Sequence, residues 1–189
     1  MSIKNAFHHL KTINHHKMLV MQHCFKVGLY KQALLHDLSK YTWIEFRTGV
    51  RYYQGNRSPN TVEREVTGCS EAWLHHKGRN KHHLEYWIDH SKDATKGFAG
   101  MKMPVKYVVE MFCDRMAASK NYQKEQYRDD SALRYYQRGE DRYGELFHPK
   151  SKALLVYLLK MLAEEGEEAT FRHIKQEILT GKADIVKDY

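Results

Sequence analysis

Apolar residues recur along most of the chain at the three- and four-residue intervals of an amphipathic helix. The clearest stripe lies within residues 13–29 and mixes apolar with imidazole groups, at Ile13, His16, Leu19, Val20, His23, Cys24 and Val27. Spacing at i, i+3, i+4 and i+7 predicts a helix that turns this stripe toward the protein core. Gly28 follows the stripe and is suited to end the helix.

Similar patterns predict helices over most of the remaining sequence, which contains only three prolines and eleven glycines. The expected fold is therefore all-α, with strands scarce. We expect one helical-bundle domain, with a core at about residues 13–121 and a helical extension at about 122–189. Thr61 is the expected N-cap of one helix, and Pro104 suits the first turn of another. The expected helices are 30–38, 43–53, 61–76, 82–90, 104–121, 125–137, 151–164 and 170–180.

The composition is that of a globular protein without a disulfide framework. Of 189 residues, 42% are hydrophobic and 29% are charged, which is enough apolar material for a core. The cysteines at 24, 69 and 113 are scattered and form no CxxC pair, which favours reduced thiols in the cytoplasm and excludes zinc fingers. No apolar run approaches the ~18 residues of a membrane span, and the amino-terminal sequence lacks a signal-peptide core. We expect a cytoplasmic protein with no membrane association.

The positive charge favours anionic ligands. Lys and Arg total 31 against 23 Asp and Glu, so the formal net charge is +8, but no dense basic run marks a nucleic-acid patch. Some of the 13 tyrosines stand beside arginines, as Tyr52 and Tyr53 do near Arg51 and Arg57, and can stack on bases. Helix cores use such tyrosines more often. A small phosphorylated substrate, with a nucleotide favoured, is the expected partner, while nucleic acid stays an alternative and the oligomeric state is not indicated.

The string ALLHDLSKY, at residues 33–41, contains an adjacent His36 and Asp37. At a helix end, two neighbouring side chains can both turn toward one pocket and offer a nitrogen and an oxygen to one divalent ion. Such mixed ligands suit Mn, Fe, Co, Ni or Zn better than Ca. A single His-Asp dipeptide occurs often by chance, so its weight depends on the residues that accompany it.

Three further segments supply candidate ligands. His16 shares its helix face with Val20 and stands 20 residues before His36, so an antiparallel return can bring the two together, whereas His23 is more typical of a hydrogen-bonded core histidine. The segment WLHHKGRNKHHLEYW, at residues 73–87, places four histidines within nine residues. Asp114 follows apolar residues, so it must be solvated, metal-bound or paired, for example with Arg115.

In chain order these residues read H…HD…H…H…D, and HDLSK is similar to an HDxxK motif. The chain thus resembles the HD-domain superfamily of metal-dependent phosphohydrolases. The strings HHK, LLHDLSK, WLHHKGRNKHH and EMFCDRMAA look more closely like an uncharacterised family of small HD-like proteins of bacteria and phages. The resemblance implies an HD-type helical bundle with one or two divalent ions (Mn, Fe, Co, Ni, Zn or Mg). It implies His16, His36, Asp37 and Asp114 as ligands of the first ion, and His76 with His82 or His83 as ligands of a second ion or the substrate phosphate.

The resemblance also implies a reaction, which is hydrolysis of a nucleotide or other small phosphoester by a metal-activated water. It assigns catalytic roles to Asp37 and Lys40. The expected phosphate-binding residues are Lys40, Arg79, Asn80 and Arg115, of which Asn80 can instead support a ligand histidine or form a simple turn. Two alternatives stay open: an HD-fold di-iron oxygenase, and a non-catalytic metal-containing protein that binds nucleic acid or a protein partner.

Overall fold

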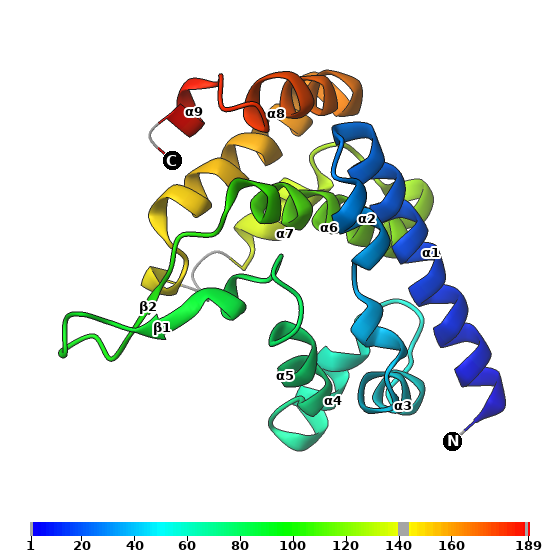
Figure 1. The fold of residues 1–189 in the computed structure, drawn as a ribbon. Coiled ribbons are helices and arrows are strands. Elements are labelled where there is room, and N and C mark those ends of the chain that lie inside the picture. The colour runs from blue at the N-terminus through cyan, green and yellow to red at the C-terminus, as the bar shows by residue number, and fades with distance from the viewer. Residues whose placement is uncertain (1, 140–143, 188) are drawn as a thin grey trace.

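The structure is a computed structural model that describes residues 2–139, 144–187 and 189. It confirms the expected all-α fold, to which one small two-stranded sheet is added (Figure 1). The α-helices are α1 (Ile3–Val27), α2 (Tyr30–Leu35), α3 (Trp43–Arg51), α4 (Pro59–Thr67), α5 (Glu71–Lys77), α6 (Val105–Gln123), α7 (Ser131–Gln137), α8 (Pro149–His173) and α9 (Asp184–Lys187). Short 3-10 helices are η1 (Leu38–Tyr41), η2 (Leu84–Trp87), η3 (Lys124–Gln126) and η5 (Gly144–Leu146), and a π-helical turn is η6 (Ile174–Ile178).

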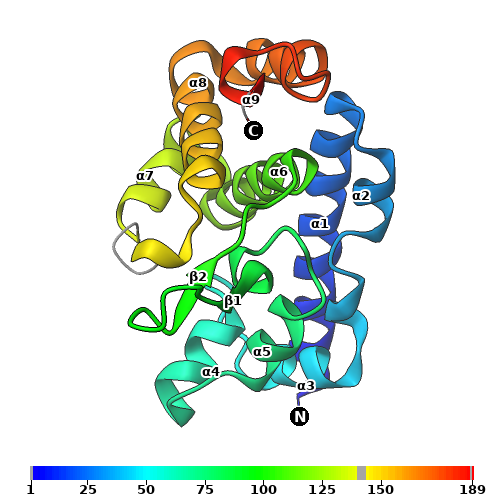
Figure 2. The same cartoon turned by 60° about the vertical axis from the view of Figure 1, so that its left-hand side comes forward.

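Helix α6 is the centre of the core. It lies between α1 and α2 on one side and α8 on the other, as the two views show (Figures 1 and 2). Its buried face includes Val108, Val109, Phe112 and Met116. Helix α8 covers α6 with fully buried leucines, each of which contributes about 1.5–3 kcal/mol by leaving water. They are Leu154, Leu155, Leu158, Leu159 and Leu162.

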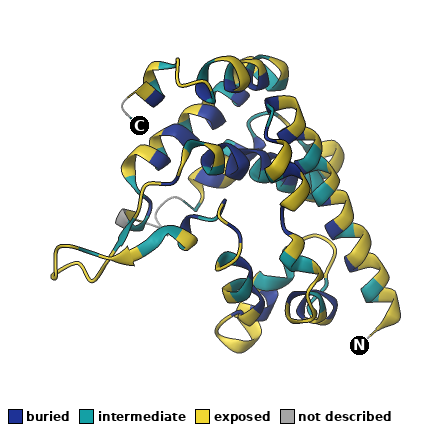
Figure 3. Cartoon of the chain, in the orientation of Figure 1, coloured by how far each residue is buried: buried dark blue, intermediate teal, exposed yellow. Residues whose placement is uncertain are grey.

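Helix α1 buries the imidazole-containing stripe that the sequence pattern predicts. Its N-cap Ser2 accepts a hydrogen bond from the Asn5 amide, and Gly28 ends it in the left-handed conformation, with φ of 88°. The helix begins at Ile3 and not near residue 13, because the first three turns carry their apolar side chains on an exposed face (Figure 3). Helices α3, α4 and α5 form a smaller group packed beside the amino-terminal half of α1.

One long expected helix is two helices in the structure. The segment 61–76 divides into α4 and α5, because Gly68 ends α4 in the left-handed region with φ of 81°. Ser58 is the N-cap of α4 in place of Thr61, and Ser70 caps α5 with its side chain.

The segment 82–90, in contrast, does not form the expected α-helix. It forms η2 and then β1 (Ile88–His90), which pairs antiparallel with β2 (Phe98–Gly100) in a hairpin. Helix periodicity in so short a stretch could not reveal its pairing with residues 98–100. Near the carboxyl terminus, the expected break between 151–164 and 170–180 lies at Gly166, whose non-helical φ of 80° and ψ of 177° divide α8 into two helical parts. No helix among the described residues has the length and apolarity needed to cross a bilayer.

Candidate metal centre

The His-Asp pair lies in a tight turn between α2 and η1. Asp37 adopts the left-handed conformation, with φ of 53° and ψ of 26°, which is uncommon for a residue other than glycine. Lys17 on α1 supports the turn, because its Nζ donates hydrogen bonds to the carbonyl oxygens of Leu34 at 3.0 Å and His36 at 2.8 Å. The turn directs both His36 and Asp37 into the protein, where each is 2% exposed.

The first group of possible ligands contains His16, His36, Asp37 and Asp114, all of which the sequence pattern singled out. His16 Nε2 lies 2.9 Å from Asp114 Oδ1 and 3.8 Å from Asp37 Oδ2. His36 Nε2 lies 3.3 Å from the same Asp37 oxygen. One donor atom from each residue lies within 4.8 Å of the others. Since each metal–ligand bond is about 2.0–2.2 Å long, one ion can bridge donors at such separations after small adjustments.

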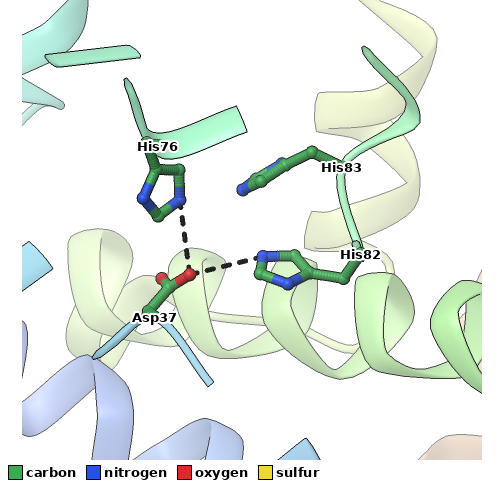
Figure 4. A group of neighbouring side chains, drawn as sticks. All are labelled: Asp37, His76, His82 and His83. Carbon is green, nitrogen blue, oxygen red and sulfur yellow. Dashed lines mark ion pairs between the residues drawn. The ribbon is translucent and has the colours of Figure 1, made fainter. Parts of the chain in front are cut away.

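The second group contains Asp37, His76, His82 and His83, and Figure 4 shows these side chains converging. Here the other carboxylate oxygen is used, because Asp37 Oδ1 lies 3.3 Å from His76 Nε2 and 3.5 Å from His82 Nε2. The sequence left open which of His82 and His83 faces the site, and the structure brings both there. Asp37 therefore offers one oxygen to each group, as a carboxylate that bridges two ions does.

Two glutamates orient the histidines from behind. Glu110 Oε1 lies 3.0 Å from His36 Nδ1 and 3.3 Å from His82 Nδ1. Glu45 Oε2 lies 2.8 Å from His76 Nδ1 and Glu45 Oε1 lies 2.6 Å from His75 Nδ1. A carboxylate can only accept, so each Nδ1 donates to its glutamate, and the Nε2 atoms of His36, His76 and His82 are left facing Asp37. Histidines that bind metals are commonly held in this way.

Several buried polar atoms in the cluster have no hydrogen-bond partner within the described part of the chain. They include the Nε2 atoms of His36, His82 and His83 and Oδ1 of Asp37. Leaving such atoms unpaired costs about 1–3 kcal/mol each, so a native protein is expected to satisfy them. A divalent ion on each side of Asp37 would do so, because all of these are donor atoms for metals.

The charges in the cluster also fit a cation. Burial would raise the pKa of Asp37, but His36, Lys40 and His76 outweigh it and hold that pKa well below its usual range. The pKa of Asp114 is also held well below its usual range, because His16 and His36 outweigh its burial. Burial lowers the pKa of His83 well below its usual value, and His82 and His76 lower it further. The cluster thus combines ionised carboxylates with at least one neutral imidazole, which is the state that binds metal.

One protein-family profile matches a stretch of the chain that contains the whole cluster. The profile described as "Family of unknown function (DUF5662)" matches residues 5–161, which is most of the chain. The chain belongs to the DUF5662 family. No curated protein and no solved structure matches it. Every member of both ligand groups falls within the matched residues of this DUF5662 protein.

A cleft of about 500 Å³ opens onto this candidate metal centre. Of the expected phosphate-binding residues, Lys40 and Arg115 line it. Arg79 does not, since it is exposed and its Nη1 donates to the His75 carbonyl oxygen at 3.2 Å. Asn80 does not line it either, because its amide donates to Ser39 Oγ at 2.8 Å and to the carbonyl oxygen of His76. Asn80 thus supports a candidate ligand, which is one of the roles that the sequence allowed.

Sequence reasoning missed the residues that support the ligands of this DUF5662 centre. Glu110 was visible one helical turn before Asp114, where its position among apolar residues could have marked it as buried. Glu45 and Lys17 gave no local signal, because their partners are distant in the chain. His23 matches its expected role, since it is buried with Nδ1 3.3 Å from the carbonyl oxygen of Cys113.

Replacing Glu110 by glutamine is expected to weaken metal binding by about 10- to 100-fold, the usual effect of losing a carboxylate behind a ligand histidine. Glutamine has nearly the same shape as glutamate but lacks the negative charge that faces the Nδ1 atoms of His36 and His82. Competition with a chromophoric chelator measures the change. Glu165→Gln, at an exposed position of α8, serves as the matched control. Equal affinities of the two variants would contradict the role given to Glu110.

Proposed function

We propose that this protein is a divalent-metal-dependent phosphohydrolase that acts on a nucleotide or another small phosphoester through a metal-activated water. The observation that carries the proposal is the placement of Asp37 between two ligand groups, with one carboxylate oxygen toward each. Paired ions that share a carboxylate are a common device for phosphoester hydrolysis. The resemblance of HDLSK and its accompanying histidines to HD-domain phosphohydrolases supports the same reaction.

The side chains of the protein have separate tasks in this proposal. A bound divalent ion would lower the pKa of a coordinated water toward neutrality and offset charge on the phosphoryl oxygens. Asp37 holds the centre together and is placed to orient the attacking water. Lys40 Nζ lies 2.6 Å from Asp37 Oδ2, and although burial would lower its pKa, Asp37 and Asp114 raise it, so Lys40 stays cationic.

Arg115 supplies a second positive charge at the cleft. Its guanidinium group lies over the Tyr136 ring, 5.6 Å from the centroid, and its Nε has no hydrogen-bond partner among the described residues. A phosphate oxygen would satisfy that donor, and the planar fork of arginine suits phosphate. The volume of the cleft falls within the ~300–1,000 Å³ of small-molecule sites, which favours a small phosphoester over a nucleic-acid duplex.

The test combines elemental analysis of the purified protein with a screen of nucleotides and generic phosphoesters. We expect at least one divalent ion per chain and a hydrolysis that His36→Ala abolishes. The control is His90→Ala, which changes an exposed histidine of β1. Metal below one ion per chain, with no activity sensitive to His36→Ala, would overturn the proposal.

The same experiment separates the two alternatives. The second ligand group, three histidines with one carboxylate, also suits iron. Bound iron with oxygen consumption and no phosphate release would favour an HD-fold oxygenase. Metal binding without turnover, together with nucleic-acid or protein binding that survives Asp37→Asn, would favour a non-catalytic binder.

A further inference from the structure

The cleft continues well beyond the metal centre, and this outer part has its own chemistry. Its walls come from α1, α3, the loop after α3 and the carboxyl-terminal half of α6. The candidate metal ligands account for only a small part of its lining. The remaining space must therefore receive the part of the substrate that does not react, and its lining indicates what that part is.

Helix α6 forms one wall with a row of residues that leads away from the metals. Asp114, Ala118 and Tyr122 follow one another at intervals of four residues, and all line the cleft. With a rise of 1.5 Å per residue, Ala118 lies about 6 Å and Tyr122 about 12 Å along the helix from Asp114. The small Ala118 leaves room between the metal ligand and the tyrosine ring. Tyr122 as a whole is 36% exposed, so a ligand in the cleft can reach it.

Helix α1 forms a corresponding row on its own side of the cleft. From the metal ligand His16 the row passes through Thr12 to His9, two turns away. Tyr53 joins this row, because its hydroxyl lies 2.9 Å from Thr12 Oγ1 and its ring lies 6.0 Å from the His9 ring. A side chain at Gly49 would collide with His9, since an added Cβ would lie 1.9 Å from His9 Nε2. The absence of that side chain lets His9 occupy the wall.

The outer part of the cleft is polar but carries little negative charge. The carboxylates that line the cleft are Asp37, Glu45, Glu85 and Asp114, none of which lies in the outer segments 53–61 or 118–123. Burial, with a smaller contribution from the charge of Lys40, lowers the pKa of His9 to about 4, so its ring is neutral near pH 7. The other lining groups there are hydroxyls, amides and tyrosine rings, with Arg57 paired to Glu65. The rings offer flat apolar faces, and the hydroxyls and amides offer hydrogen bonds at their edges.

We propose that the outer cleft binds a flat ring system that carries hydrogen-bonding groups and is attached to the phosphate, with Tyr122 as its main stacking surface. This inference rests on the proposed function for the position of the phosphate. The spacing of the α6 row suits a ring that is joined to the phosphate through a sugar, as the base of a nucleoside monophosphate is. A substrate without a ring would leave this wall unused.

The test compares substrates that share a pentose phosphorylated on its 5-carbon but differ in the attached ring. Adenosine and thymidine 5′-monophosphates carry the ring, and ribose 5-phosphate does not. Tyr122→Ala is expected to lower kcat/KM for both nucleotides by about 5- to 150-fold, the range for losing one stacked base. It should change kcat/KM for ribose 5-phosphate by less than about twofold, because the metal centre and Arg115 are untouched. Tyr122→Phe keeps the ring and should retain the wild-type values.

Two controls keep the test independent of folding and of catalysis. Tyr157→Ala removes a tyrosine with the same 36% exposure, on α8 and outside the cleft lining, and should have no effect. Calorimetric titration with adenosine and thymidine measures ring binding without any reaction, and Tyr122→Ala should weaken it at least fivefold. Equal losses for nucleotides and ribose 5-phosphate, or unchanged nucleoside binding, would overturn the inference. Tyr122-dependent nucleoside binding without any hydrolysis would support the ring site and overturn the proposed reaction.

Discussion

Asp37→Asn is expected to abolish metal binding at both ligand groups and to reduce hydrolysis on the order of 1,000-fold, the several kcal/mol that a metal centre contributes. The asparagine side chain would keep one oxygen but lose the negative charge, so it could not serve both groups. The backbone should be preserved, because asparagine tolerates the left-handed conformation that Asp37 adopts. Metal analysis of the purified variant and phosphate release from the best substrate measure the two effects.

Asp184→Asn is the matched control for this variant, since Asp184 is exposed in α9, where it pairs with Lys187. It should retain wild-type metal content and activity. Circular dichroism distinguishes a folded Asp37→Asn protein from an unfolded one. A folded variant that still holds two ions per chain would rule out a bridging role for Asp37.

Removing the metal is expected to have the second large effect, a drop in thermal stability. The ligands come from α1, the turn after α2, the 76–83 segment and α6, so an ion joins parts of the chain that only tertiary packing otherwise holds together. An ion at 100 times its Kd stabilises the fold by about 2.7 kcal/mol. For a chain of this length each kcal/mol corresponds to about 2–4 °C, so chelation should lower Tm by about 5 to 11 °C.

The stabilisation by metal should also depend on pH in a definite direction. Burial alone would lower the pKa of His36, but Asp37, Asp114 and Glu110 raise it well above its usual value when no metal is bound. Metal must displace that proton, so metal affinity falls as pH falls. The Tm difference between metal-loaded and chelated protein should therefore be larger at pH 8 than at pH 5.5. A difference that stayed constant or grew toward acid pH would contradict metal binding by these histidines.

The sequence was most informative where chemistry and helix periodicity coincide. His16 stood on a periodic apolar face, which predicted that its ring would point inward, and the structure buries it beside Asp114. All seven ligands could be predicted because each lies in a string with several possible donor groups. The structure brings all seven together. Periodicity alone also identified α1, α3 and α6. Helix α1 begins ten residues before the expected start, whereas the ends of α3 and α6 differ from the expected ones by two residues or fewer.

The sequence was least informative where the structure depends on contacts between distant segments. The hairpin of β1 and β2 depends on pairing across a turn, which a helix-like period in 82–90 concealed. Glu45 and Lys17 act on partners 31 and 17 to 19 residues away, and no local pattern encodes such a choice. Arg79 appeared suitable for phosphate because it lies among histidines, but its side chain turns back to the preceding helix, α5, where it donates to the His75 carbonyl oxygen.

The close contact between Gly49 and the His9 ring has a consequence for how this family can diverge. An alanine at position 49 cannot coexist with a histidine at position 9 unless the ring leaves the cleft wall. The two positions should therefore change together among homologues, with a larger residue at 49 accompanied by a smaller one at 9. Such paired replacements would reshape the outer cleft while leaving the candidate metal ligands intact, and we expect them to mark branches of the family whose substrates differ.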